Sequence, residues 1–235
     1  MPAGRRRGLF VTGTDTGVGK TIVAAAIVAA LRARGTAVKA LKPVITGLDE
    51  PPDPLWPRDH ELLAQAAGSA PGDVTLVRYG PAVSPHLAAE LIGDPIEPLE
   101  LRKAVLAAVD AANREAELLV IEGVGGLLVP LSDGYDVRDL AVDIGFPLLI
   151  AARPGLGTIN HTLLTIEAAR RAELQIAGVV LTPWPRSADQ IARANRATIE
   201  RLGGLSVSTL PEIASPDPAL LAQGGSGLPI SDWLA

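Results

Sequence analysis

The chain has 235 residues, of which 48% are hydrophobic and 20% charged, and its formal net charge is −5, which is typical of one globular domain without a disordered tract. It contains no cysteine, which excludes disulfides, thiolate nucleophiles and cysteine-ligated zinc or iron–sulfur clusters. The acidic balance argues against nucleic acid as a general partner.

Neither export nor membrane insertion is indicated by the sequence. No apolar run approaches the roughly 20 residues of a membrane-spanning helix. Arg5, Arg6 and Arg7 are followed by only three apolar residues, which are too few for a secretory signal. We therefore expect a cytoplasmic protein that does not act at a membrane.

A glycine-rich loop follows the first apolar run. Leu9-Phe10-Val11 predicts a buried strand, and the residues from Ile22 to about Arg34 predict a helix that ends at Gly35. The connecting sequence is Gly13-Thr14-Asp15-Thr16-Gly17-Val18-Gly19-Lys20-Thr21. Strand, loop and helix together are typical of a phosphate-binding loop, although five residues rather than four separate Gly13 from the Gly-Lys-Thr triplet. The alternative is a glycine-rich turn that binds nothing.

In a phosphate-binding loop, each of these residues has a chemical reason to be present. The backbone N–H groups of Gly17, Val18 and Gly19 turn toward phosphate oxygens, and the N-terminus of the helix adds partial positive charge. We expect Lys20 to reach the β- and γ-phosphates and the Thr21 hydroxyl to bind Mg²⁺.

The second predicted strand, Ala37–Leu41, ends in Lys42-Pro43-Val44-Ile45-Thr46-Gly47. Ligands bind at this end of open parallel sheets, so Lys42 is expected on the same rim as the phosphate loop. An ordinary surface lysine is the alternative. Residues 49–58 are rich in proline and acidic side chains and predict a surface loop.

A helix is predicted to begin at Asp59. This carboxylate is either a plain N-cap or a group turned toward Mg²⁺, and the sequence leaves both open. His60 and Glu61 are expected on the solvated face and receive no role. Val74–Tyr79 predicts a short strand, and Ser84-Pro85-His86 begins a helix through Ile92, with His86 read as packed or capping rather than as a ligand. An amphipathic scaffold helix is predicted from Pro98 to about Glu115.

Leu118–Ile121 predicts a strand buried on both faces, and Glu122 follows it directly. In phosphate-loop proteins an acid at this position holds the Mg²⁺ shell. The following residues Gly123, Val124 and Gly125 allow a ligand to approach the backbone closely.

The rest of the chain continues the alternation of helices and strands. A helix is predicted over Asp136–Ile144 and a strand over Pro147–Ala152; then come a helix up to Ala172, a strand over Ile176–Leu181, a helix over Ala188–Leu202 and a strand over Leu205–Leu210. Together the elements predict an α/β fold with a doubly wound, mostly parallel sheet and helices on both faces. We read no chemistry in the tail from Ala214.

Three further segments are candidates for ligand contacts. Gly157, Thr158 and Asn160 open a helix whose backbone donors are able to hold an anion such as a carboxylate, although Thr158 as a simple N-cap is an equal alternative. Rim positions follow two strands, and they are Thr182, Pro183, Pro211, Glu212 and Ile213.

Four motifs resemble the dethiobiotin synthetase family, the ATP-dependent carboxylases that close the ureido ring in biotin synthesis. They are Val11-Thr12-Gly13-Thr14-Asp15-Thr16-x-Val18-Gly19-Lys20-Thr21, Lys42-Pro43-Val44-x-Thr46-Gly47, Glu122-Gly123-x-Gly125-Gly126 and Gly157-x-Ile159-Asn160-His161. The resemblance covers nearly the whole chain, and the order and spacing of the four motifs together are specific, whereas any single motif is not.

The resemblance implies a single P-loop NTPase-type domain over residues 1–235 and a reaction of 7,8-diaminononanoate (7,8-diaminopelargonate) with CO₂. ATP phosphorylates the resulting carbamate, the second amine attacks, and dethiobiotin, ADP and phosphate are formed. It also implies Mg²⁺ and a homodimer whose substrate site includes both subunits. A carbamate oxygen needs no general base, which agrees with a site that lacks an obvious catalytic histidine or cysteine.

Residue roles follow from the motif positions. The resemblance implies that Thr21, Asp59 and Glu122 surround Mg²⁺, and that Lys20 and Lys42 bracket the carbamate and the transferring phosphoryl group. Thr16 and Thr46 would hydrogen-bond the carbamate, and Thr16 counts with the two lysines as catalytic. The substrate carboxylate would be bound by Gly157, Thr158 and Asn160 of the second subunit, and the nucleotide by the loop, by Gly123–Gly125 and by the rim residues.

The sequence departs from the family at two positions. Gly17 stands where some members have Glu, so a carboxylate role is absent there. Thr182 stands where some members have an Asn that reads the adenine edge, and a hydroxyl offers less than an amide that donates and accepts together. We therefore expect a relaxed choice of nucleoside triphosphate.

Other classes of P-loop protein are less consistent with the sequence. Partitioning or positioning ATPases, which act on a protein partner, carry Lys where this chain has Asp15 and glycines at the positions of Thr16 and Gly17. The amide ligases of cobalamin synthesis add a glutaminase domain with a catalytic cysteine, and this chain has no cysteine. A bare nucleotide-binding module has no use for Lys42 or the loop at Gly157.

Overall fold

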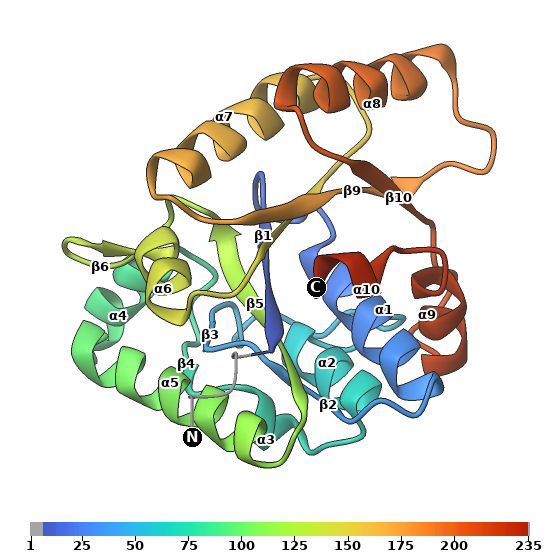
Figure 1. The fold of residues 1–235 in the computed structure, drawn as a ribbon. Coiled ribbons are helices and arrows are strands. Elements are labelled where there is room, and N and C mark those ends of the chain that lie inside the picture. Colours follow the sequence, from blue (N-terminus) through green and yellow to red (C-terminus); the bar gives the residue numbers. More distant parts are fainter. Residues whose placement is uncertain (1–6, 235) are drawn as a thin grey trace, which may run out of the picture.

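The computed structural model describes residues 7–234, so that Arg5 and Arg6 lie outside the described residues. A six-stranded parallel sheet in the order β10-β9-β8-β1-β5-β2 forms its centre (Figure 1). These strands are β1 (Gly8–Gly13), β2 (Val38–Leu41), β5 (Leu118–Gly126), β8 (Leu148–Ala152), β9 (Ile176–Trp184) and β10 (Val207–Pro211). Two small ladders pair β3 (Val44–Ile45) with β4 (Val77–Arg78) and β6 (Pro130–Ser132) with β7 (Tyr135–Asp136).

Ten helices connect and cover the strands over residues 7–234. They are α1 (Lys20–Ala33), α2 (Asp59–Ala67), α3 (Pro71–Val74), α4 (Pro85–Ile92), α5 (Pro98–Arg114), α6 (Val137–Ile144), α7 (Thr158–Arg171), α8 (Gln190–Gly203), α9 (Pro218–Gly225) and α10 (Ile230–Trp233). Figure 1 shows α7 and α8 over one side of β9 and β10, with α1, α9 and α10 on the other side. Among the described residues, no helix combines the length and apolar character needed to cross a membrane.

Side chains that alternate along each strand divide the core into two layers. Leu9 and Val11 of β1 belong to the layer that also contains side chains of α1, α2, α9 and α10, whereas Phe10 belongs to the layer that contains side chains of α5, α6, α7 and α8. Successive strand residues point to opposite faces, so a strand covered on both sides must be apolar throughout. This is why the strands appear in the sequence as continuous apolar runs, and why the predicted doubly wound parallel sheet is confirmed.

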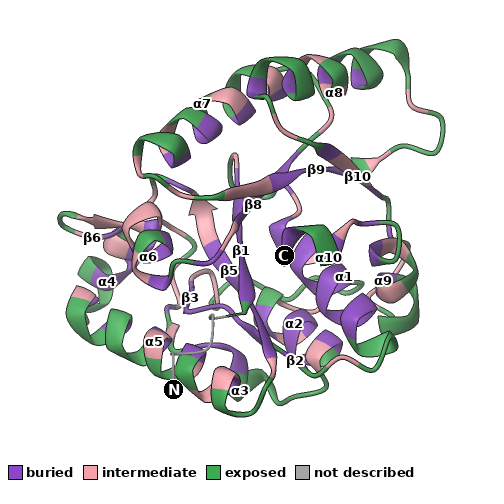
Figure 2. Ribbon diagram, viewed as in Figure 1, coloured by how far each residue is buried: buried purple, intermediate pink, exposed green. Residues whose placement is uncertain are grey.

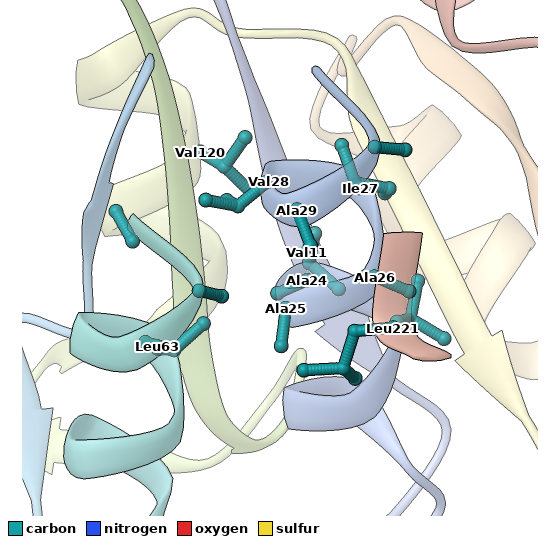
Figure 3. Packing of buried hydrophobic residues seen from close by; sticks show 14 of the residues in the cluster. Val11, Ala24, Ala25, Ala26, Ile27, Val28, Ala29, Leu63, Val120 and Leu221 are labelled. Carbon is teal, nitrogen blue, oxygen red and sulfur yellow. The ribbon is translucent and has the colours of Figure 1, made fainter. Parts of the chain in front are cut away.

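Helix α1 is buried over most of its length (Figure 2). Its alanines let neighbouring elements approach closely, and Figure 3 shows Val11 and Val120 of the sheet, Leu63 of α2 and Leu221 of α9 gathered around it. At the closest approach of α9, a Cβ added to Gly225 would lie only 2.2 Å from the carbonyl oxygen of Ala26. The helix that carries the phosphate loop at its N-terminus is therefore held firmly from three sides.

Most predicted elements are confirmed within a few residues, with several differences. The tail from Ala214 contains α9 and α10, which pack on the core. His60 was expected on a solvated face but is 7% exposed. The residue at the N-cap of α2 is Arg58, so Asp59 is the first helical residue and not the cap. The N-cap of α7 is likewise Gly157 and not Thr158.

Candidate active site

One cavity of ≈ 970 Å³ opens at the carboxyl ends of the parallel strands. The predicted residues that line it are Thr16, Gly17, Gly19, Lys20, Thr21, Lys42, Thr46, Asp59, Glu122, Val124, Gly125, Thr182, Pro183, Pro211, Glu212 and Ile213. Strands that run parallel place their carboxyl ends at one edge, and this brings together loops more than 100 residues apart in the chain, such as those of Thr21 and Glu122.

Five predicted residues do not line this cavity: Val18, Gly123, Gly157, Thr158 and Asn160. The Val18 side chain is buried in the core beneath the loop. Thr158 is 5% exposed, and its hydroxyl lies 3.4 Å from that of Thr162 in the same helix. Asn160 is exposed. The loop predicted to bind a carboxylate is therefore separate from the cavity of its own chain.

The phosphate loop turns at two glycines in the left-handed region, Gly17 with φ 69° and Gly19 with φ 92°. Gly19 occupies the N-cap of α1, where no side chain caps the free N–H groups. Such a helix start presents backbone donors to an anion. The Lys20 ammonium is buried beside this turn and donates to the Asp15 carbonyl oxygen at 2.8 Å.

Opposite the loop, Lys42 lies between two carboxylates. Its ammonium is 2.6 Å from Oε1 of Glu122 and 2.7 Å from Oδ2 of Asp59. The Lys42 and Glu122 side chains are almost fully buried, at 4% and 0% exposed, whereas that of Asp59 is 49% exposed. The Thr21 hydroxyl donates to the same Glu122 oxygen at 2.9 Å. The surface-lysine alternative for Lys42 is therefore wrong.

Burial and pairing shift the ionisation of these groups in different directions. Burial lowers the pKa of Lys20, because desolvation outweighs the attraction of Glu122. Burial also acts on Lys42, but there the two carboxylates prevail and raise the pKa of its ammonium. Burial raises the pKa of Glu122 against the attraction of Lys42, while Lys42 lowers the pKa of the more exposed Asp59.

The donors fit a magnesium ion bound together with phosphates. Mg²⁺ commonly takes one or two protein carboxylates, completing its octahedron with phosphate oxygens and water. Glu122 offers a buried second oxygen, Oε2, without a hydrogen-bond partner, next to the Thr21 hydroxyl, and Asp59 faces the cavity. Within residues 7–234 no group of three His, Cys, Asp or Glu side chains is arranged to hold a metal ion.

Part of the lining was not foreseen from the sequence. Residues 49–58 were predicted as a surface loop, but Asp53, Trp56 and Pro57 from this segment line the cavity. Arg58 fastens the segment by donating to the carbonyl oxygens of Gly47 at 3.2 Å and Glu50 at 2.8 Å. Further apolar lining comes from Ile45, Ala82, Val83, Pro85 and Val129. Isolated residues of this kind carry no motif that would reveal them in a sequence.

The sheet order, the phosphate loop and the paired lysines and carboxylates define a P-loop NTPase fold. Two solved structures are similar to it at low sequence identity. A ParA family ATPase from Chlorobium tepidum TLS has a TM-score of 0.53 and 16% identity, covering 96% of this chain and 92% of that one. The chloroplast FtsY of Physcomitrella patens has a TM-score of 0.56 and 15% identity, covering 94% of this chain and 66% of that one. These similarities concern the fold alone.

Sequence relatives identify the family more closely. A family described as an AAA domain matches residues 7–217. The ATP-dependent dethiobiotin synthetase BioD of Haloferax mediterranei is 39% identical, covering 89% of this chain and 87% of its own. Those of Anaeromyxobacter dehalogenans and Mycobacterium avium are 44% and 36% identical, covering 83% and 97% of this chain and 85% and 92% of their own. The chain belongs to the dethiobiotin synthetase family, the ATP-dependent ligases of biotin biosynthesis.

Proposed function

We propose that the protein joins CO₂ to 7,8-diaminononanoate and closes the cyclic urea of dethiobiotin, converting ATP to ADP and phosphate. Membership of the ATP-dependent dethiobiotin synthetase family supports this activity. Among the structural observations, the main support is Lys42, a buried cation opposite Lys20 in a cavity that also offers carboxylates. Phosphoryl transfer needs mainly positioning and charge stabilisation, and two lysines beside a phosphate loop supply both.

The reaction proceeds in three steps. One amine adds to CO₂ and loses a proton, which gives a carbamate. A carbamate oxygen attacks the γ-phosphorus of ATP, and the bond to the β-phosphate oxygen breaks, which gives ADP and a carbamic–phosphoric anhydride. The second amine then attacks the carbonyl carbon and loses a proton, the bond from this carbon to the phosphate oxygen breaks, and the ring closes as phosphate leaves.

Each predicted residue has a role in these steps. Lys20 and Lys42 hold the charge of the carbamate and of the transferring phosphoryl group, and the hydroxyls of Thr16 and Thr46 donate to the carbamate. Thr21, Asp59 and Glu122 would hold Mg²⁺. The metal, when bound, would neutralise charge that develops between the β- and γ-phosphates. The apolar lining around Ile45 and Val83 suits an aliphatic substrate chain.

The nucleotide base would lie at the rim formed by Thr182, Pro183, Pro211, Glu212 and Ile213. Gly123, Val124 and Gly125 would let the nucleotide approach the backbone of β5. We also propose that residues 1–235 act as one catalytic domain, because the sheet from β2 to β10 carries all of these loops.

The substrate carboxylate would be bound by Gly157, Thr158 and Asn160 of a second copy of the chain. These residues do not line the cavity of their own chain, and Leu156 beside them is 100% exposed. We therefore propose a homodimer with two sites, each built from both subunits.

The activity is tested by incubating the protein with Mg²⁺, ATP, labelled bicarbonate and the diamine. We expect label to enter an acid-stable cyclic urea in step with phosphate release. Phosphate release without fixed label would instead support a switch ATPase. Lys42→Ala should lower turnover by several orders of magnitude while nucleotide binding persists, whereas Lys39→Ala, a neighbouring exposed lysine, should turn over normally.

The shared site is tested by co-expressing the inactive variants Lys42→Ala and Asn160→Ala. In a mixed dimer one site takes Lys42 and Asn160 from unaltered positions, so random pairing restores about a quarter of the wild-type activity. If both residues act within one chain, co-expression restores no activity and the proposal of a shared site is wrong. An active monomer in sedimentation would likewise contradict the dimer.

A further inference from the structure

Arg153 connects two loops that the motifs treat separately. It follows β8 directly, and β8 lies beside β1 in the sheet. Its guanidinium donates twice to one oxygen of the phosphate loop, the carbonyl oxygen of Gly17, from Nη2 at 2.8 Å and from Nε at 3.2 Å. None of the four family motifs contains Arg153, and it does not line the cavity.

The orientation of the Gly17 carbonyl matters for anion binding. A phosphate loop works by turning N–H groups toward the anion, and a carbonyl oxygen turned the same way would repel it. Gly17, with φ 69°, has no side chain that fixes the orientation of its peptide. Gly17 lines the cavity, and its carbonyl oxygen accepts from Arg153, which does not line the cavity, so this oxygen is engaged by a group outside the lining.

We propose that Arg153 is a positioning residue for nucleotide binding, which acts by fixing the Gly17 peptide. The other hydrogen bonds of the loop described next fix different peptides. The Thr14 N–H donates to the Ala151 carbonyl oxygen at 3.0 Å and fixes the start of the loop. Lys20 holds the Asp15 carbonyl oxygen, but the same ammonium is the group expected to contact phosphate. Arg153 holds the loop without competing for the ligand.

The segment that carries Arg153 is itself fixed. Asn195 of α8 is 8% exposed, and its amide donates to the carbonyl oxygens of Pro154 at 3.0 Å and Gly155 at 3.2 Å. An arginine on an anchored segment can fix the position of another loop, whereas an arginine on a mobile segment would move together with that loop. The same segment continues into Gly157 and Thr158, so one anchored stretch links the phosphate loop to the proposed carboxylate loop.

The contact between Arg153 and Gly17 also disfavours a larger residue at position 17. A Cβ added there would lie 3.1 Å from Nη2 of Arg153, in addition to the strain of a positive φ. Gly17 and Arg153 therefore depend on each other: the glycine leaves room for the guanidinium, and the guanidinium fixes the peptide that the glycine leaves free.

The inference rests only on the nucleotide site of the proposed function, and its test needs no diamine. Binding of Mg²⁺–ADP and of a non-hydrolysable ATP analogue is measured by titration calorimetry. We expect Arg153→Ala to weaken both by a similar factor of about ten or more, because one charge-assisted contact that orders the loop is lost. If the lost interaction stabilises the ground state and the transition state equally, KM for ATP rises and kcat stays within about twofold of the wild-type value.

Two further variants separate this role from other effects of the charge. Arg34→Ala is the matched control, since it removes an arginine that donates to a backbone carbonyl, that of Ser226 at 3.1 Å, at the far end of α1. It should bind nucleotide like the wild type. Arg153→Lys keeps the charge but not the two-pronged guanidinium, and it should bind nearly as weakly as Arg153→Ala. Because Arg153 is exposed, both of its variants should melt close to the wild type.

Three results would overturn the inference. The first is unchanged affinity of Arg153→Ala for both nucleotides. The second is a fall in kcat with unchanged affinity, which would mean that the guanidinium acts on the transition state. The third is full recovery of affinity by lysine, which would mean that charge alone matters. Failure of the proposed reaction would appear differently, as a wild-type protein that binds nucleotide but fixes no CO₂.

Discussion

Replacing Lys42 by methionine tests whether the Lys42 ammonium compensates the negative charges of the Glu122 and Asp59 carboxylates. Methionine preserves most of the side-chain volume and removes the ammonium that lies 2.6 Å from Glu122 and 2.7 Å from Asp59. Glu122 is then a fully buried carboxylate whose closest remaining donor is the Thr21 hydroxyl. Removing one partner of a buried ion pair costs about 3–5 kcal/mol, because the other charge stays uncompensated.

For Lys42→Met we expect a loss of about 3 kcal/mol in the free energy of unfolding, near the lower end of that range because Asp59 is half exposed. For a chain of this size, about 3 kcal/mol lowers Tm by roughly 6–12 °C. Urea unfolding followed by circular dichroism, in buffer with chelator and without nucleotide, measures the change. Lys39→Met is the control, since Lys39 lies on β2 just before Lys42. Its side chain is 46% exposed and pairs with the exposed Glu115 and the partly exposed Glu117, and solvent-accessible pairs contribute less than about 1 kcal/mol.

A double variant makes the test specific for charge. If the loss arises from the uncompensated carboxylate, adding Glu122→Gln to Lys42→Met should return at least about 1.5 kcal/mol, although a second contact has been removed. A cost of Lys42→Met no larger than that of Lys39→Met would refute the reasoning. So would a double variant less stable than Lys42→Met alone, because the loss would then come from packing.

Three further changes have expected outcomes. Relaxed nucleotide choice through Thr182 predicts that kcat/KM for ATP exceeds that for CTP or GTP by less than about a hundredfold, and that Thr182→Asn increases the preference; a wild-type preference above a hundredfold would reject this. Glu122→Gln should raise the Mg²⁺ concentration for half-maximal turnover by roughly tenfold or more, and an unchanged Mg²⁺ dependence would remove Glu122 from the metal site. Gly225→Ala should cost about 1–3 kcal/mol in chemical unfolding, because its Cβ would lie 2.2 Å from the Ala26 oxygen, whereas Gly227→Ala, with nothing within 4 Å, should stay within about 0.5 kcal/mol; equal costs would contradict the close packing of α9.

The parts of the fold that could be predicted from the sequence are those with a strong local signal. Strands β1, β5 and β8 are continuous apolar runs because both of their faces are covered. The proximity of Thr21 and Glu122 could be expected for a related reason, because β1 and β5 are parallel neighbours whose carboxyl ends share one edge of the sheet. Residues at the carboxyl ends of neighbouring strands therefore lie close together in space, although they are far apart in the chain. Strand β5 extends to Gly126, however, so Glu122 lies within the strand and not after it as predicted.

What could not be predicted depends on tertiary contacts. Helix α9 has a favourable start, with Asp217 as N-cap and Pro218 in its first turn, but it has only eight residues and ends in two glycines. So short a helix depends on the packing of Leu221 and Gly225 against α1. His60 lies in a polar run, and only the packing of α2 buries it. Arg153 is one arginine after a strand, and nothing in its neighbourhood indicates that its guanidinium reaches a loop 136 positions away.

The pairing within the site explains how so many charges are tolerated below the surface. A pocket that takes both a polyphosphate and a cation needs charges of both signs, and burial penalises each of them alone. Here Lys42 is compensated by Glu122 and Asp59, so its pKa rises, whereas the Lys20 ammonium donates to a backbone carbonyl and its burial outweighs the attraction of Glu122, so its pKa is lowered. The two lysines are therefore not equivalent. A phosphate placed beside Lys20 would add to the attraction of Glu122, and because the fold has already desolvated this ammonium, little further desolvation of the lysine would oppose nucleotide binding.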